Sequence, residues 1–428
     1  MRFLTSSRKL AAAATAAVLT ATVAPAISQP AAAVEPTQPS VGESATSSFE
    51  STSVRPPLRA VLQRDADALL PQGVPGVLAQ VSGRHGTVRV RSGYGNLERR
   101  TPVPWNAHFR IGSLTKPFVS TTVLQLVGEG KLSLDDTVER WLPGLVRGNG
   151  NDGRRITVRQ LLQHTSGLPN YVLGLPWLID KEGFEQHRFD TVTARKAVRL
   201  AMDSKPDFAP GQGWNYSNTN YALAGMLIKR VTGNTWRHEV RQRIVKPLRL
   251  RETTVPYTSP RVPAPHAVGY ERFPGPGATP EDPRYGEQID ATLQNPSWGG
   301  AAGAIISTTH DTNTFLRALV RGRLLKPAQL AEMKRTVTTS EAFQQAWPGS
   351  RYGLGIVWVP NSCGGSWSHG GDIMGYMTRN GVTPDGSRSV MVSFNTDSPK
   401  REPGVPAPKH EMTRTLIDHA LCGVGGGS

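Results

Sequence analysis

The stretch Phe109-Arg110-Ile111-Gly112-Ser113-Leu114-Thr115-Lys116 decides how this chain is interpreted. It ends in Ser-x-x-Lys at the start of an expected helix, residues 113 to about 128, with Pro117 in the first turn, where proline is tolerated. Residues three apart share a helix face, so the Lys116 amine can reach the Ser113 hydroxyl. A hydroxyl needs an adjacent base to act as a nucleophile, and a desolvated lysine can supply one.

A second motif, Tyr216-Ser217-Asn218, lies about a hundred residues further on, before an expected helix at 219–232. A Tyr-x-Asn can place a phenol and an amide side by side, one for proton transfer and one for holding a substrate. The alternative interpretation is a loop tyrosine followed by an asparagine that caps the helix.

A third motif, His369-Gly370-Gly371, precedes a strand expected at 374–380. Glycines let the main chain approach a ligand closely, and the histidine can donate or accept a hydrogen bond. Alone, the motif is more typical of a histidine in a surface turn. The sequence contains neither Gly-x-Ser-x-Gly nor His-Glu-x-x-His, which argues against an α/β-hydrolase and a zinc peptidase.

Composition limits the classes of protein to which the chain can belong. The chain has 428 residues, of which 38% are hydrophobic, enough for one large core or two packed lobes. Lys and Arg number 49 against 33 for Asp and Glu, but the basic residues are scattered and no nucleic-acid motif is present. Two cysteines exclude a disulfide-stapled miniprotein and argue against a cysteine-based zinc site.

The amino terminus predicts export. Arg2, Arg8 and Lys9 precede an apolar run, residues 10–27, and small-residue cleavage signatures follow, as in a secretory signal peptide over 1–33. The run is shorter than the roughly 20 residues that a membrane-spanning helix needs. We therefore expect a secreted protein without a membrane span. Residues 34–56 lack periodicity and predict a disordered lead-in.

Cys363 and Cys422 are expected to form a disulfide in an oxidising compartment. The bridge would tie the end of a helix expected at 409–421 to the region near Cys363. Closing a loop of about 60 residues stabilises a chain by roughly 4 kcal/mol in the chain-entropy model.

Strands are expected at both ends of the chain, with helices between them. This pattern predicts an α/β (α+β) fold in one catalytic domain, residues 57–428, whose antiparallel sheet is completed by N- and C-terminal segments. The sheet lobe comprises 57–130 and 291–428, and a mostly helical lobe, 131–290, is inserted. The other expected strands are 76–82, 87–93, 353–359 and 389–395, and the other expected helices are 58–70, 235–248, 310–321 and 327–336.

Together, the three motifs and their order resemble the active-site serine penicillin-recognising proteins. The chain is similar to the class C β-lactamase and D-alanyl-D-alanine carboxypeptidase family, particularly the secreted Streptomyces-type DD-peptidases. The octapeptide that ends in Lys116 carries this resemblance, and so do the stretches 126–132, 156–168 and 352–355. The resemblance implies the β-lactamase/transpeptidase-like fold.

The resemblance also implies roles for individual residues. Ser113 would be acylated, Lys116 would be its proton partner, and Tyr216 would shuttle protons to the leaving group. The implied substrate-binding residues are Asn218, Trp298, His369, Gly371 and Asp372, and the main-chain N–H groups of Ser113 and Asp372 would form the oxyanion hole. No metal or cofactor is implied. The implied ligands are peptidoglycan-type D-amino-acid peptides and β-lactams, and we expect a monomer.

Two departures from the family pattern concern substrate choice. Asp372 replaces the hydroxyl residue usual after His-x-Gly, and residues 352–359 contain no arginine to hold a terminal carboxylate. An acid repels a carboxylate and attracts an ammonium. The leading hypothesis is a serine D-Ala-D-Ala carboxypeptidase, with Arg351 or Arg379 as possible sources of the cation. A D-stereospecific aminopeptidase, endopeptidase, amidase or esterase, a β-lactamase and a non-catalytic cell-wall-binding module are the alternatives.

Overall fold

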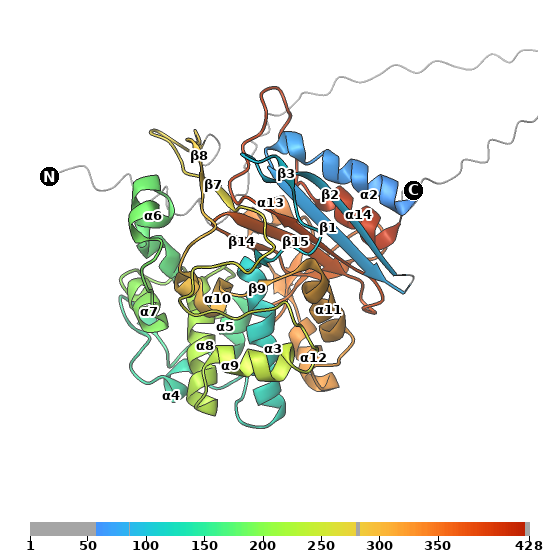
Figure 1. The fold of residues 1–428 in the computed structure, drawn as a ribbon. Helices are drawn as coiled ribbons and strands as arrows, with labels where there is room; N and C mark the ends of the chain where they lie inside the picture. Colours follow the sequence, from blue (N-terminus) through green and yellow to red (C-terminus); the bar gives the residue numbers. More distant parts are fainter. Residues whose placement is uncertain (1–56, 85, 280–282, 424–428) are drawn as a thin grey trace, which may run out of the picture.

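The computed structural model describes residues 57–84, 86–279 and 283–423 (Figure 1). The predicted signal peptide, 1–33, and the predicted lead-in, 34–56, lie outside the described residues.

A large antiparallel sheet joins the two ends of the chain. Its strands follow the order β10-β11-β12-β13-β15-β16-β1-β2-β3, and β14 pairs with β15. N-terminal and C-terminal strands meet where β1 pairs with β16, with Val77 opposite Phe394. This arrangement confirms the predicted fold class. The strands are β1 (Gly76–Gly83), β2 (Gly86–Asn96), β3 (Thr101–Pro102), β10 (Val337–Thr338), β11 (Arg351–Tyr352), β12 (Val357–Val359), β13 (Ser366–Ser368), β14 (Gly371–Ile373), β15 (Tyr376–Val382) and β16 (Ser389–Phe394).

Helices cover both faces of this sheet. The helices α2 (Leu58–Asp67) and α14 (Arg414–Cys422) lie side by side on one face (Figure 1), where they pack on β1, β2, β15 and β16. On the other face, α11 (Thr309–Val320) packs on β1 and β16. Because successive side chains of a strand point to opposite faces, Ala79 of β1 belongs to the core under α2 and α14, whereas Gln80 accepts a hydrogen bond from Thr309 of α11.

Helix α3 (Thr115–Gly128) is the centre of the helical part of the molecule. Nearly all of its side chains are buried, and it packs against α8 (Asn218–Thr232), α9 (Trp236–Val240) and α10 (Gly300–Gly303). Burial on all sides makes α3 a rigid support for the residues at its start. Within the described ranges, no helix is both long and apolar enough to cross a membrane.

Shorter elements complete the fold. The helices and helical turns among them are η1 (Leu70–Gln72), η2 (Gly112–Leu114), α4 (Val138–Trp141), α5 (Val158–Gln163), η3 (Tyr171–Gly174), η4 (Pro176–Leu178), α6 (Lys181–His187), α7 (Ala194–Met202), η5 (Arg241–Val245), η6 (Pro296–Trp298), α12 (Pro327–Lys334) and α13 (Glu341–Ala346). The strands among them are β4 (Phe109–Arg110), β5 (Arg147–Gly148), β6 (Asn151–Asp152), β7 (Tyr270–Arg272), β8 (Gln288–Asp290) and β9 (Ile306–Ser307).

The strand expected at 353–359 is broken in the structure. The chain leaves the sheet after β11 and returns at Val357, because it bends at Gly355, which has φ +83°. A Cβ at Gly355 would lie 2.2 Å from the Ser120 hydroxyl oxygen, so the main chain here lies against α3. The strand expected at 374–380 is preceded by β14, and the two are separated by a turn at Gly375 with φ +79°.

Two expected helices also differ in extent. The helix expected at 235–248 is α-helical only over α9 and continues as the π-helical turn η5. The helix expected at 409–421 begins at Arg414, since Glu411 accepts hydrogen bonds from the Thr413 N–H and hydroxyl rather than joining the helix.

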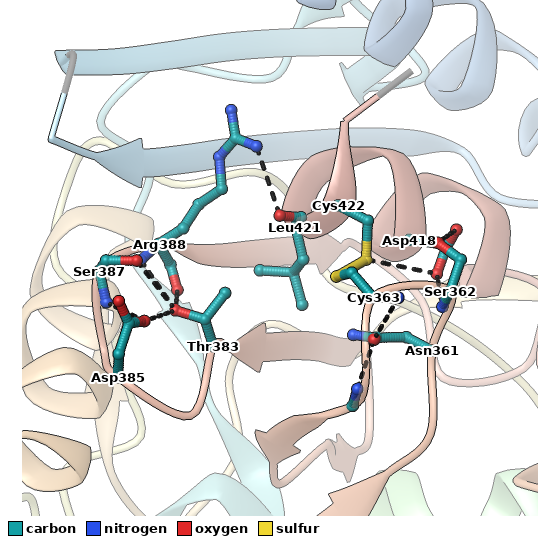
Figure 2. Close-up of a disulfide and its surroundings, with 11 residues drawn as sticks. Asn361, Ser362, Cys363, Thr383, Asp385, Ser387, Arg388, Asp418, Leu421 and Cys422 are labelled. Atoms are coloured by element: carbon teal, nitrogen blue, oxygen red, sulfur yellow. Dashed lines mark hydrogen bonds between the residues drawn. A yellow bond between two sulfur atoms is a disulfide. The ribbon is translucent and has the colours of Figure 1, made fainter. Parts of the chain in front are cut away.

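The disulfide between Cys363 and Cys422 is present, which confirms that prediction (Figure 2). It closes a separation of 59 residues and links the turn between β12 and β13 to the end of α14. Asp418 reinforces the link, because its carboxylate accepts hydrogen bonds from the Ser362 N–H at 2.8 Å and hydroxyl at 2.7 Å. The C-terminal helix is thus fastened to the sheet.

Candidate active site

The predicted nucleophile lies in η2, at the start of α3, where two glycines bring separate segments together. Gly112 has φ +50°, and a Cβ on it would lie 2.8 Å from the main-chain nitrogen of Asp372. A Cβ on Gly371 would lie 1.9 Å from the Ile111 carbonyl oxygen and 2.9 Å from the Ser113 nitrogen. Only glycine allows this approach of β14 to η2. The main chains of Ser113 and Asp372 are therefore close, as the predicted oxyanion hole requires.

Lys116 is fully buried and contacts the nucleophile. Its Nζ lies 2.9 Å from Ser113 Oγ, 2.8 Å from Asn218 Oδ1 and 3.0 Å from the Ala302 carbonyl oxygen. Burial lowers the pKa of Lys116 well below its usual value, and the charge of Asp372 opposes this in part. Both carbonyl oxygens can only accept. A neutral amine would donate to them and direct its lone pair at the Ser113 hydroxyl, as a general base must.

Tyr216 lies beside this pair. Lys116 Nζ is 4.6 Å from the centroid of the Tyr216 ring. Burial raises the pKa of Tyr216 well above its usual value, and the adjacent Ser113 hydroxyl opposes the rise. Within the described residues, the buried Tyr216 hydroxyl completes no hydrogen bond of normal geometry. It is thus a neutral O–H group next to the nucleophile, with a proton available for a leaving group.

His369 is neutral and fixed on both nitrogens. Its Nδ1 lies 2.7 Å from the Gly370 carbonyl oxygen, which can only accept, so Nδ1 carries the proton and Nε2 accepts the Tyr352 hydroxyl at 2.9 Å. Burial lowers the pKa of His369 to about 3. The Asn380 amide holds the main chain, since its Nδ2 donates to the His369 carbonyl at 2.6 Å. At neutral pH this histidine offers no positive charge to a substrate.

Asp372 forms part of a charged group with Arg379 and Glu411. Its Oδ1 lies 2.6 Å from Arg379 Nη1, and Arg379 Nε lies 3.1 Å from Glu411 Oε1. One guanidinium between two carboxylates leaves the group with a net negative charge. Arg351, the other candidate cation, lies in β11 and is bonded to Thr336. Arg379 is therefore paired with two carboxylates, whereas Arg351 is held by hydrogen bonds to neutral threonine side chains.

Trp298 ends η6 and is separated from α10 by Gly299. Its Nε1 donates to Gln294 Oε1 at 3.2 Å, and its ring lies edge-to-face on Trp177 with centroids 6.2 Å apart. The Ala302 carbonyl, which accepts a hydrogen bond from Lys116, lies in α10, so only a few residues of chain separate the predicted aromatic wall from a Lys116 contact.

The site contains residues to which the sequence assigned no role. Tyr352 orients His369, Glu411 neutralises Arg379, and His164 is buried against Tyr216 with ring centroids 4.3 Å apart. Tyr352 and His164 lie within the stretches that carry the family resemblance, and this resemblance was the one sequence signal that could have identified them. Among the residues that the structure describes, no three or more His, Cys, Asp or Glu side chains are grouped so as to hold a metal ion.

Fold and site together define a serine hydrolase of the β-lactamase and penicillin-binding protein superfamily. A family model described as Beta-lactamase matches residues 59–409, so the chain belongs to the Beta-lactamase family.

Two solved structures resemble the whole described fold. A D-stereospecific amidohydrolase from Streptomyces sp. is 40% identical, with a TM-score of 0.76 over 86% of this chain and 100% of the other. D-amino acid amidase from Ochrobactrum anthropi SV3 is 28% identical, with a TM-score of 0.70 over 86% of this chain and 98% of the other.

Among curated proteins, penicillin-binding protein 4* of Bacillus subtilis (strain 168) is 32% identical over 165 residues, which is 38% of this chain and 34% of the relative. The matches to the first curated relatives span between 34% and 52% of those proteins' own lengths.

Proposed function

We propose that the protein hydrolyses amides and short peptides of D-amino acids that carry a free α-ammonium group. The observation that carries this proposal is the charge on the strand side of the site, where His369, Asp372 and Arg379 lie. Arg379 is between two carboxylates, and His369 is neutral. A substrate carboxylate meets no unneutralised cation among these residues, whereas an ammonium meets a net negative charge. Similarity to a D-stereospecific amidohydrolase and a D-amino acid amidase supports the same substrate class.

In the proposed reaction, the neutral Lys116 amine takes the Ser113 proton as Oγ attacks the substrate carbonyl carbon. The N–H groups of Ser113 and Asp372 donate to the oxyanion. Tyr216 gives its proton to the leaving nitrogen as the C–N bond breaks, and it is reprotonated by the Lys116 ammonium. Water then attacks the acyl-enzyme, releases the acid and returns a proton to Ser113.

The second candidate is a D-alanyl-D-alanine carboxypeptidase that binds peptidoglycan-type peptides and β-lactams. The similarity to penicillin-binding protein 4* favours it. This activity needs a cation for the substrate's terminal carboxylate, and Arg379 would have to exchange one of its carboxylate partners for the substrate. The predicted signal peptide supports export, so we propose that either activity is exerted outside the cytoplasm.

A substrate panel separates these candidates. It compares D-phenylalanine amide, its L-enantiomer, its N-acetyl derivative, a peptide ending in D-Ala-D-Ala and a short-chain ester, with Ser113→Ala as the control. We expect the D-amide to be preferred, and N-acetylation to lower kcat/KM at least about tenfold because it removes the ammonium. Indifference to acetylation, combined with a preference for the D-Ala-D-Ala peptide, would refute the first proposal and support the second.

A further inference from the structure

His164 adopts a left-handed backbone conformation, which is uncommon for residues other than glycine. It follows α5 with φ 62° and ψ 30°, in the left-handed region, and its side chain is fully buried. For a residue with a Cβ this conformation is unfavourable, because the Cβ lies close to the following carbonyl oxygen. Such strain persists only where the surrounding structure holds it, and it clusters at functional sites.

What holds His164 is the segment that carries Tyr216. The His164 carbonyl accepts the Asn215 N–H at 3.1 Å, and its Nδ1 accepts the Ser217 N–H at 3.2 Å. These two hydrogen bonds bracket Tyr216 on both sides. The His164 ring also lies against the phenol ring, tilted by 35°. His164 thus holds the tyrosine segment through its main-chain carbonyl and through its side chain, which also packs on the phenol ring.

The protonation state of His164 follows from its partners. Nδ1 accepts a second hydrogen bond from Asn220 Nδ2 at 3.0 Å, and Asn220 Oδ1 is occupied by the Ser166 hydroxyl at 2.6 Å, which sets the amide orientation. Because Nδ1 faces two donors, the proton is on Nε2, which is buried without a partner among the described residues. A buried donor without a partner also destabilises the folded state. Two such costs at one residue point to a role beyond packing.

We infer that His164 is a positioning residue, which holds the Tyr216 hydroxyl where it can protonate the leaving group. The Nδ1 acceptor is the essential feature, since an imidazolium would turn an N–H toward the Ser217 N–H. This inference goes beyond the proposed function. It requires acyl transfer at Ser113, but it holds for any class of substrate that the protein accepts.

If His164 positions Tyr216, the loss of activity in a His164 variant should depend on the leaving group. A purely structural role predicts no such dependence. Nitrophenoxide departs without a proton, whereas phenoxide gains from one. Two acetate esters, 4-nitrophenyl and phenyl, therefore share an acyl group and differ in their need for Tyr216. The ratio of their kcat/KM values, measured on one preparation, is independent of how much of the protein is folded.

The variants His164→Asn and His164→Gln form a matched pair. Asparagine places an oxygen at the position of Nδ1 and tolerates a left-handed backbone, whereas glutamine places its amide one atom further out. General acid catalysis contributes about 10²–10⁴-fold. We therefore expect glutamine to lower kcat/KM on the phenyl ester at least about tenfold more than on the nitrophenyl ester. Asparagine should restore the wild-type ratio to within about threefold.

His108→Asn is the control, since His108 is also buried but bonds to Glu252 and Pro265, and its ratio should not change. A glutamine variant with the wild-type ester ratio would overturn the inference, as would an asparagine variant with the glutamine ratio. If the glutamine variant is insoluble, Asn220→Asp removes a donor to Nδ1 and should shift the ratio in the same direction. Rates on D-amino acid amides by the wild-type protein decide the proposed function separately.

Discussion

The two sides of the site handle charge in opposite ways. On the helix side, Lys116 is fully buried and its hydrogen-bond partners within the described ranges are all neutral oxygen atoms, so its amine is driven toward the uncharged form. On the strand side, the Asp372 side chain is 53% exposed and forms an ion pair with Arg379. Burial supplies reactivity, because it makes a base of an amine. Exposed charge supplies discrimination, because it attracts or repels a ligand without altering the nucleophile.

The largest effect should come from removing the nucleophile. Among the described residues, the Ser113 hydroxyl is the one oxygen that contacts Lys116 and can also donate a proton. Ser113→Ala removes it, so kcat/KM should fall at least about 1000-fold on every substrate of the panel. Circular dichroism should be unchanged. If the helix side serves all substrates equally, the loss is uniform. Covalent labelling by a fluorescent penicillin above a trace level in this variant would contradict the assignment.

Replacing the buried base should be nearly as damaging. Lys116→Met keeps the volume and removes the amine, and we expect a loss of about 100–1000-fold. In the wild type, kcat/KM should fall as pH falls through the lowered pKa of Lys116, because the protonated amine cannot accept the Ser113 proton. The variant should lack this acid limb. If kcat/KM of the variant still falls at low pH, the titrating group is not Lys116.

The sequence predicted the helix side better than the strand side, and for a physical reason. Ser113 and Lys116 are three residues apart on one helix, so local geometry fixes their contact. Arg379 and Glu411 are 32 residues apart and meet only through the tertiary fold. The same holds for His164 and Ser217, which are 53 residues apart. The break at Gly355 likewise arises from the close approach of α3, which strand propensity cannot anticipate.

Stability and chemistry should separate at the disulfide. The double variant Cys363→Ser, Cys422→Ser opens the link between the sheet and α14, and we expect a loss of about 2–4 kcal/mol in the free energy of unfolding. The site residues are held by other contacts, so kcat/KM below the melting transition should stay within about twofold, well under 1 kcal/mol. Denaturation of both forms with and without reductant provides the measurement. If kcat/KM falls together with the free energy of unfolding, the disulfide also supports the site, which would contradict this prediction.

The smallest predicted effect concerns Asp372. Asp372→Thr leaves Arg379 paired with Glu411 alone, so the strand side changes from net negative to neutral. Two charges 4 Å apart interact by about 4 kcal/mol at an effective dielectric of 20, and solvent screening of this exposed group leaves a fraction of that. A remainder of about 1.4 kcal/mol changes a specificity ratio tenfold. We therefore expect activity on the D-Ala-D-Ala peptide to rise about tenfold relative to D-phenylalanine amide.

The matched control for this last prediction is Asp385→Thr. Asp385 is similarly exposed, at 57%, and is also paired with an arginine, Arg84, but it lies in the turn between β15 and β16. Its replacement should leave the ratio unchanged, which removes the net charge of the whole protein as an explanation. If Asp372→Thr also leaves the ratio within about twofold, the Asp372 carboxylate does not face the ligand. Substrate choice would then depend on the absence of an arginine from residues 352–359, and introducing one there would be the decisive variant.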